Sequence, residues 1–275
     1  MKGWLWGEGL NPQGLEAGAP PSGARAHRAV VRLTGVWLLT LLSMPLAQGA
    51  LGDVALHAGI VVTVLLQASI SLLILVGAAG WNRALRTAAV VVVVAWASEA
   101  IGWSTGFPFG RYHYTSLLQP QLLGVPLLIP LAWLMMLPPS WALAQRITGR
   151  ASGAAYVLVS ALAFTAWDLF LDPQMVHWGV WAWEAEGAYF GIPVANFVGW
   201  LAVAALINLV SRPPALPTRA PIVIYALTWI TETVGLLVFW RLTGPAIVGF
   251  LGMGAALLVA LALSRARRDV ASAFA

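Results

Sequence analysis

Apolar runs long enough to cross a lipid bilayer follow one another along most of this chain. A helix needs about 20 apolar residues to span the hydrocarbon core, and only helices or closed barrels can pair all of their backbone groups in lipid. The runs lie at about 30–50, 55–79, 86–105, 121–144, 152–172, 191–211, 220–241 and 244–264. The sequence therefore predicts an all-α fold, a polytopic membrane helical bundle with about eight transmembrane helices.

The composition leaves little room for anything else. Of the 275 residues, 60% are hydrophobic and 9% are charged, whereas about a quarter of the residues in a soluble domain are charged. We expect residues 29–275 to form a single transmembrane helical domain. Residues 1–28 are rich in Gly and Pro and are expected to form a flexible cytoplasmic N-terminal tail. The first apolar run ends in PLAQGA, which fits a signal-peptidase site, but its basic flank also fits a retained helix.

The positive charges predict the orientation in the membrane. Cytoplasmic loops carry an excess of Lys and Arg. With eight spans and the N-terminus inside, all of the 15 Lys and Arg residues except Arg111 and Arg241 fall on the cytoplasmic side. We therefore expect both termini in the cytoplasm and a multi-pass protein of the cell (cytoplasmic) membrane. The net charge of +5 comes from scattered arginines, so no nucleic acid is expected as a partner.

Two parts of the sequence share an order of acid, loop, Gly-x-Pro and Trp. Glu99 is followed by GVPLLIPLAW at 124–133, and Asp168 is followed by GIPVANFVGW at 191–200. A second, shorter similarity pairs two segments that each have a Trp three residues before an acid, 96–102 and 229–235. We interpret these similarities as a repeated helical-hairpin unit, with chance similarity among apolar helices as the alternative.

Four acidic residues lie inside the predicted spans, where an ionisable side chain is expensive and usually marks a substrate path, a proton relay or a catalytic site. They are Glu99, Asp168, Asp172 and Glu232. Asp168 and Asp172 are four residues apart and share one face of their helix. Pro173 is expected to end that helix, which places Asp172 against the negative end of the helix dipole. Apolar surroundings, the like charge and the dipole all favour a neutral acid, so both aspartates are candidate proton donors.

A structural alternative exists for the acids and for the tryptophans near them. The two aspartates would then only cap span ends or bind Arg111 or Arg241. Aromatic faces beside acids suit a site where positive charge develops on an apolar substrate, but tryptophans in membrane proteins more often form interface belts. A belt is expected for Trp178, Trp181 and Trp183. The candidates for contact with a substrate are Trp96, Trp229 and Trp167.

Two loop segments supply further candidates for substrate binding. The segment GFPFGRYHY at 106–114 is expected on the outer side next to Glu99 and contains Arg111, Tyr112, His113 and Tyr114. A lone His in such a loop is more often a surface residue than a catalyst. The segment at 191–200 adds Asn196 and Trp200.

The sequence contains no motif for a metal or an organic cofactor. It has no HExxH, no His pair at helical spacing and only one DxxxD, and it shows no Gly-rich phosphate loop, dinucleotide fingerprint or Ser-His-Asp arrangement. The chain has no cysteine, which excludes disulfides and thiolate metal sites. We therefore expect neither a metal nor a cofactor.

Three blocks of the sequence resemble a known family. The blocks at 99–133, 168–183 and 189–200 are similar to the bacterial and archaeal carotenoid-biosynthesis membrane proteins that include the CruF-type carotenoid 1,2-hydratases and bisanhydrobacterioruberin hydratase. The resemblance implies a hydro-lyase that adds water across the terminal 1,2 double bond of a ψ-end group. Its substrate would be lycopene, γ-carotene or a C50 analogue dissolved in the membrane. The resemblance carries no residue roles, so these must come from chemistry.

Hydration of a trisubstituted alkene needs an acid that protonates one carbon, a dry aromatic pocket for the tertiary cation and a base for the entering water. Asp172 or Asp168 is the predicted acid. The other aspartate or Glu232 would deprotonate the water, and Glu99 is the fourth candidate. Two alternatives remain open, a carotenoid cyclase that uses the same protonation and a proton-coupled membrane transporter. A homo-oligomer and contact with other carotenoid-pathway enzymes are also left open.

Overall fold

The computed structural model describes residues 21–273, with side chains described from 26 to 265. Most of the expected N-terminal tail therefore lies outside the described residues. Seven helices in the described part are long and apolar enough to cross a membrane, as expected for an all-α helical membrane protein. The helices are α1 (Pro21–Leu51), α2 (Asp53–Thr105), α3 (Leu128–Thr148), α4 (Ala154–His177), α5 (Val194–Ser211), α6 (Arg219–Val234, continued by a π-helical turn at Gly235–Phe239) and α7 (Thr243–Ala273).

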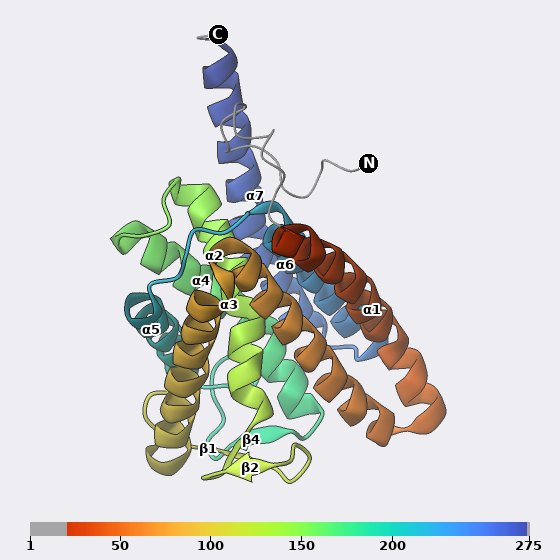
Figure 1. Ribbon diagram of the computed structural model, residues 1–275. Coiled ribbons are helices and arrows are strands. Elements are labelled where there is room, and N and C mark those ends of the chain that lie inside the picture. The colour runs from red at the N-terminus through yellow and green to blue at the C-terminus, as the bar shows by residue number, and fades with distance from the viewer. Residues whose placement is uncertain (1–20, 274–275) are drawn as a thin grey trace.

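Helix α2 is broken in the middle and contains two of the expected spans. Its 53 residues include one non-helical position, Gly80, with φ 74° and ψ 167°. A residue with a side chain is strained at this φ, whereas Gly is not. Figure 1 shows that the chain rises along the first half of α2 and descends along the second half. Counting the halves separately gives eight helical segments, while the number of membrane crossings and the side of the termini stay predictions.

Helix α4 continues past Pro173, which corrects the expectation that it ends there. The helix runs to His177, so Asp172 lies more than a turn before the end of the helix. A proline lacks the N–H that would bond to the carbonyl four residues earlier. Here that carbonyl belongs to Leu169, and it accepts a hydrogen bond of 2.8 Å from the Tyr189 hydroxyl instead. The replacement donor explains why the helix tolerates Pro173. Because Asp172 does not lie in the last turn of the helix, the helix dipole no longer favours its neutral form.

Two short antiparallel strand pairs lie at one end of the bundle, at the bottom of Figure 1. Strand β1 (Tyr112–Tyr114) pairs with β4 (Trp181–Trp183), and β2 (Gln121–Leu122) pairs with β3 (Val125–Pro126). The predicted span at 121–144 therefore begins later, at the start of α3. Tyr-His-Tyr and Trp-Ala-Trp alternate aromatic and smaller residues, and this period of two suits a strand rather than a helix. The β1–β4 pair joins the loop that follows α2, which contains Glu99, to the loop that follows α4, which contains Asp168 and Asp172.

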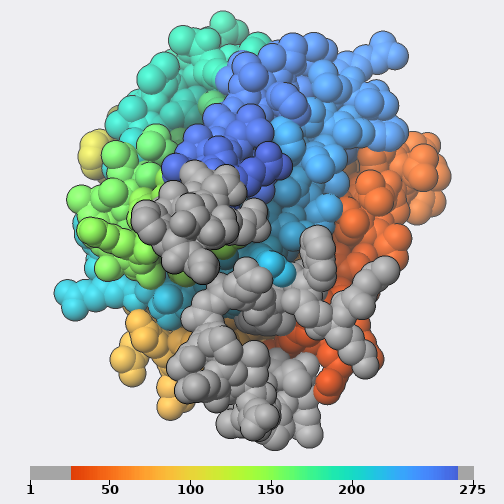
Figure 2. Space-filling view, turned by 90° about the horizontal axis from the view of Figure 1, so that it is seen from above, coloured from red at the N-terminus to blue at the C-terminus, as the bar shows by residue number. Residues whose placement is uncertain are grey.

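Helix α3 forms the centre of the bundle, with α2, α4, α6 and α7 packed around it. It contains Pro138 and Pro139 but stays helical. The carbonyl of Met135, which Pro139 leaves without its helical donor, accepts a hydrogen bond of 2.8 Å from Ser71 of α2. In the view from above (Figure 2), the first helix (red to orange) borders the C-terminal helices (blue), and the central segments (green) lie on the opposite side.

Candidate functional site

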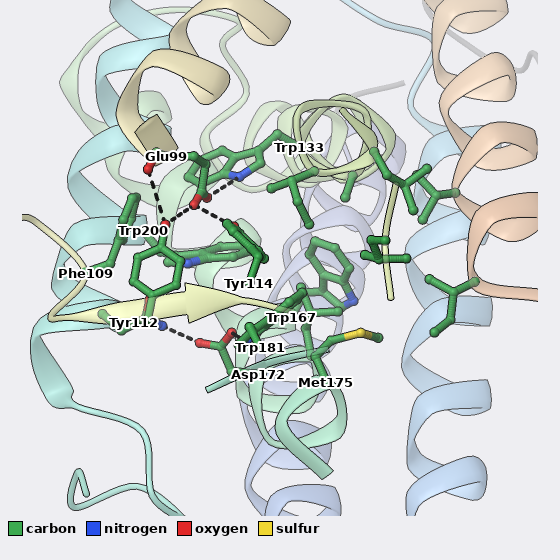
Figure 3. Close-up of a pocket in the computed structure, with 18 of the residues that line it drawn as sticks. Glu99, Phe109, Tyr112, Tyr114, Trp133, Trp167, Asp172, Met175, Trp181 and Trp200 are labelled. Atoms are coloured by element: carbon green, nitrogen blue, oxygen red, sulfur yellow. Dashed lines mark hydrogen bonds between the residues drawn. The ribbon is translucent and has the colours of Figure 1, made fainter. Parts of the chain in front are cut away.

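Two of the predicted acids line one small cavity that is bordered by the β1–β4 pair. The cavity has a volume of about 60 Å³. Glu99, near the end of α2, and Asp172, on α4, both line it, and Figure 3 shows them on opposite sides of Tyr112. The rest of the wall is mainly aromatic and apolar, and includes Phe109, Tyr114, Trp133, Trp167, Trp181 and Trp200.

Glu99 accepts hydrogen bonds from three aromatic side chains. The Tyr112 hydroxyl lies 2.5 Å and the Tyr114 hydroxyl 2.8 Å from Oε2, and the Trp133 indole nitrogen lies 3.2 Å from Oε1. Glu99 itself is buried, with 3% of its surface exposed. An ionised carboxylate can only accept, so a ring of three donors matches the charged form of Glu99.

The two tyrosines on β1 are neutral donors. Burial, and after it the negative charge of Glu99, raises the pKa of both Tyr112 and Tyr114 above the ordinary value for tyrosine. Each phenol therefore keeps its proton and can donate a hydrogen bond to the carboxylate. Both residues were predicted to bind substrate, and the structure places their hydroxyls on an acid.

The two aspartates of α4 share one amide. The Nδ2 of Asn196, on α5, donates to Oδ2 of Asp168 at 2.8 Å and also to Oδ2 of Asp172. The Trp181 indole donates to Oδ1 of Asp172 at 3.2 Å. Oδ1 of Asp168 has no hydrogen-bond partner among the described residues. Both carboxyl groups are buried, and Asp172 is the one that lines the cavity.

Trp133 and Trp200 hold the aromatic wall together. Their rings stack with centroids 4.8 Å apart, and Phe164 stacks on Trp200 at 5.2 Å. These two tryptophans end the two similar segments of the sequence, at 124–133 and 191–200. The similarity could therefore have identified Trp133, which we did not select from the sequence although it contacts Glu99.

The structure brings together some of the sequence-predicted residues and separates others from them. The members of the shared site, which line the cavity or contact its acids, are Glu99, Asp168, Asp172, Tyr112, Tyr114, Asn196, Trp167 and Trp200. The predicted residues that do not line this cavity are Glu232, Trp96, Trp229, Arg111 and His113. Arg111 and His113 are exposed, the Trp96 indole donates to the Leu122 carbonyl at 3.4 Å, and the Trp229 indole donates to the Phe250 carbonyl at 2.9 Å.

Trp181 is a site residue that was expected in an interface belt. It is buried, and its indole binds Asp172. On β4 it lies opposite Tyr114 of β1, whose hydroxyl binds Glu99. The matching alternation of Tyr-His-Tyr and Trp-Ala-Trp was the available signal, because paired strands place alternate residues on the same face.

A larger cavity of about 330 Å³ lies beside the first one, between α1, α2, α4 and α6. Glu232 lines this second cavity together with Gln174 of α4. The two cavities share six wall residues, Ile60, Val64, Met135, Trp167, Leu171 and Met175. Glu232 is therefore separated from the other acids by a wall of mostly apolar side chains.

The described residues hold no group of three or more His, Cys, Asp and Glu side chains placed to bind a metal ion. Asp168 and Asp172 are instead held by an amide and an indole. The expectation that the protein needs no metal or cofactor stays a prediction.

Comparisons with known proteins identify the family. The model of a family described as "Carotenoid biosynthesis protein" matches residues 59–261, a range that contains Glu99, Asp168, Asp172 and Glu232. Bisanhydrobacterioruberin hydratase from Haloarcula japonica is 36% identical over 106 residues, which cover 38% of this chain and 36% of that protein. The match thus spans about a third of the length of this relative. No solved structure matches the chain significantly. Since the family model covers well over half of its length, the chain belongs to the carotenoid biosynthesis protein family.

Proposed function

We propose that this protein is a carotenoid hydratase, which adds water to the terminal 1,2 double bond of a ψ-end group. The observation that carries the proposal is the pairing of two different carboxyl systems across one aromatic cavity: Glu99 is surrounded by donors, and Asp172 shares an amide with a second acid. Separate environments for two acids are the usual way in which one site obtains a proton donor and a proton acceptor. The hydratase relative supports the reaction type.

Asp172 is the proposed acid. Burying two negative charges side by side would be very costly, and Asn196 supplies only one amide nitrogen to Asp168 and Asp172. One proton held by the aspartate pair removes this cost. Asp172 lines the cavity, so it is the member that would transfer its proton to C2 of the end group, leaving a tertiary cation at C1.

Glu99 is the proposed base. Its Oε1 accepts only the Trp133 indole, at 3.2 Å, so this oxygen keeps a site for a water molecule. The oxygen of that water would attack C1 while Glu99 takes up one of its protons. The net change is the addition of one water, and the proton then returns from Glu99 to the aspartate pair. The faces of Trp133, Trp167 and Trp200 would stabilise the cation without offering it a nucleophile.

We also propose that the protein crosses the cytoplasmic membrane eight times, with both termini in the cytoplasm. Its partners would be a membrane-dissolved carotenoid and water. The break at Gly80 and the asymmetry of the arginines support this topology.

The test is pigment analysis in a lycopene-producing host, followed by conversion with purified protein in detergent. The wild type should yield a product heavier by one water. Asp172→Asn and Glu99→Gln should each lower conversion by a factor of about 10² to 10⁴, the usual contribution of a general acid or base. Glu186→Gln changes an exposed acid and is the matched control. A product of unchanged mass would identify a cyclase, and an unaltered carotenoid would favour the transporter.

A further inference from the structure

The second cavity is several times larger than the one that holds the acids. A volume of about 60 Å³ is enough for a few water molecules and not for the long chain of a carotenoid. The neighbouring cavity, of about 330 Å³, is lined mainly by apolar side chains such as Trp37, Met44 and Phe239. A chain that reaches the acids therefore needs the larger space for the part behind its reacting end.

The threonine hydroxyls that line the second cavity are already paired within their own helices. The Thr63 hydroxyl donates to the Gly59 carbonyl, Thr228 to Ile224 and Thr231 to Leu227, at 2.8 to 3.0 Å. Among the described residues that line this cavity, the indole nitrogens of Trp167 and Trp178 are buried without a hydrogen-bond partner. An occupant thus meets no threonine hydroxyl that lacks a partner, and most of the remaining wall is apolar, which suits a hydrocarbon rather than a polar ligand.

The two cavities meet at side chains that can move. Leu171 and Met175 of α4 line both cavities, and Figure 3 places Met175 on the side of the site away from Glu99. Met is unbranched and adapts its shape readily. Rotation of these two side chains would join the cavities and open a route from the larger one to Asp172.

The second cavity reaches the outer surface of the bundle between α1 and α6. Four of its lining residues are also largely exposed: Leu42 of α1, Ile230 and Val234 of α6, and Phe239 of the following π-helical turn. Helix α1 packs along α2 and touches α6 only lightly. In a membrane-spanning bundle these apolar residues would face the hydrocarbon of the bilayer.

We propose that the second cavity is the lateral entrance and seat for a long linear polyene, which slides in from the bilayer between α1 and α6. Its terminal double bond passes Leu171 and Met175 to reach Asp172, while the remaining chain lies in the cavity and extends into lipid. The identity of the end group rests on the proposed function, whereas the entrance does not.

The test uses the absence of cysteine from the chain, which allows one introduced thiol to be modified in the folded protein. Leu42→Cys and Ile230→Cys place a thiol at the mouth of the cavity. Leu39→Cys places one on α1 at a residue that is 69% exposed and does not line the cavity. Each purified variant is labelled with a bulky lipophilic disulfide-forming reagent, and lycopene binding and conversion are measured before labelling, after labelling and after reduction.

Labels at Leu42→Cys and Ile230→Cys should reduce lycopene binding and conversion about tenfold or more, because a filled cavity excludes the chain, and reduction should restore both. The label at Leu39→Cys should have no effect. Unchanged binding after labelling at both mouth positions would overturn the entrance. If label-sensitive binding occurred without any conversion by the wild type, the entrance would stand and the hydratase proposal would fail.

Discussion

Asn196 should stabilise this protein more than an ordinary buried Asn does. In Asn196→Ala the two aspartates lose their shared donor. A hydrogen bond to a charged group is worth about 1.5–3 kcal/mol and a neutral one about 0.5–1.5 kcal/mol. If one aspartate is ionised and the other neutral, the expected loss is about 2–4.5 kcal/mol, which lowers Tm by about 4–18 °C for a chain of this size.

Asn208→Ala is the matched control on the same helix. Asn208 is equally buried, but its side chain donates to one backbone carbonyl, that of Ala204, at 2.8 Å. Its loss should cost about 0.5–1.5 kcal/mol. Thermal unfolding in detergent would be followed for both variants. A Tm decrease for Asn196→Ala no larger than that for Asn208→Ala would refute the idea that Asn196 holds the acid pair.

A double-mutant cycle makes the test sharper. Asp168→Asn replaces one of the two acids with a neutral amide that can donate to Asp172. In the Asn196→Ala background it should therefore recover part of the lost stability. Groups in one network couple by about 0.5–3 kcal/mol. If the two substitutions instead reduced stability additively, the shared network would not exist as described.

Three further predictions follow from the same site. Tyr114→Phe removes a donor to Glu99 and should cost about 1.5–3 kcal/mol, measured as a lower Tm in detergent. The raised pKa of Tyr112 and Tyr114 means that the unfolded chain releases these protons first, so stability should be level below pH of about 10 and fall above it. This fall should be shallower in Tyr112→Phe, and an equal fall in both proteins would contradict the assignment. Gly102→Ala would place a Cβ 2.5 Å from the Phe109 ring and 3.2 Å from the Tyr112 hydroxyl, which should cost about 1–3 kcal/mol by overpacking and reduce carotenoid conversion. Gly35→Ala, where nothing lies within 4 Å, should leave conversion unchanged.

The sequence predicted the site correctly where the residues that come together lie on one helix. The spacing of Asp168 and Asp172 placed both on one face, and the Asn196 amide contacts both. It was uninformative about which faces of distant helices meet. Glu99 and Glu232 have similar surroundings in the sequence, each three residues after a Trp, yet they line different cavities.

The contacts made by loops were the other source of error. Pro173 was expected to stop α4, but Tyr189, sixteen residues further along the chain, supplies the donor that lets the helix continue. Trp181 was expected at the membrane interface because tryptophans in membrane proteins more often form interface belts. Its true partner depends on the pairing of β1 with β4, and that pairing depends on a register that no local pattern determines.

The pairing of β1 with β4 also ties the two acids together mechanically. Tyr114 and Trp181 are directly opposite each other in the register, and one holds Glu99 while the other holds Asp172. A movement of this strand pair away from the bundle would break the hydrogen bonds to Glu99 and to Asp172, the proposed base and acid, at the same time. A substrate that entered through this end of the bundle would separate the strands that hold both acids. The strand pair is therefore expected to stay in place during the reaction, which agrees with the proposed entrance between α1 and α6.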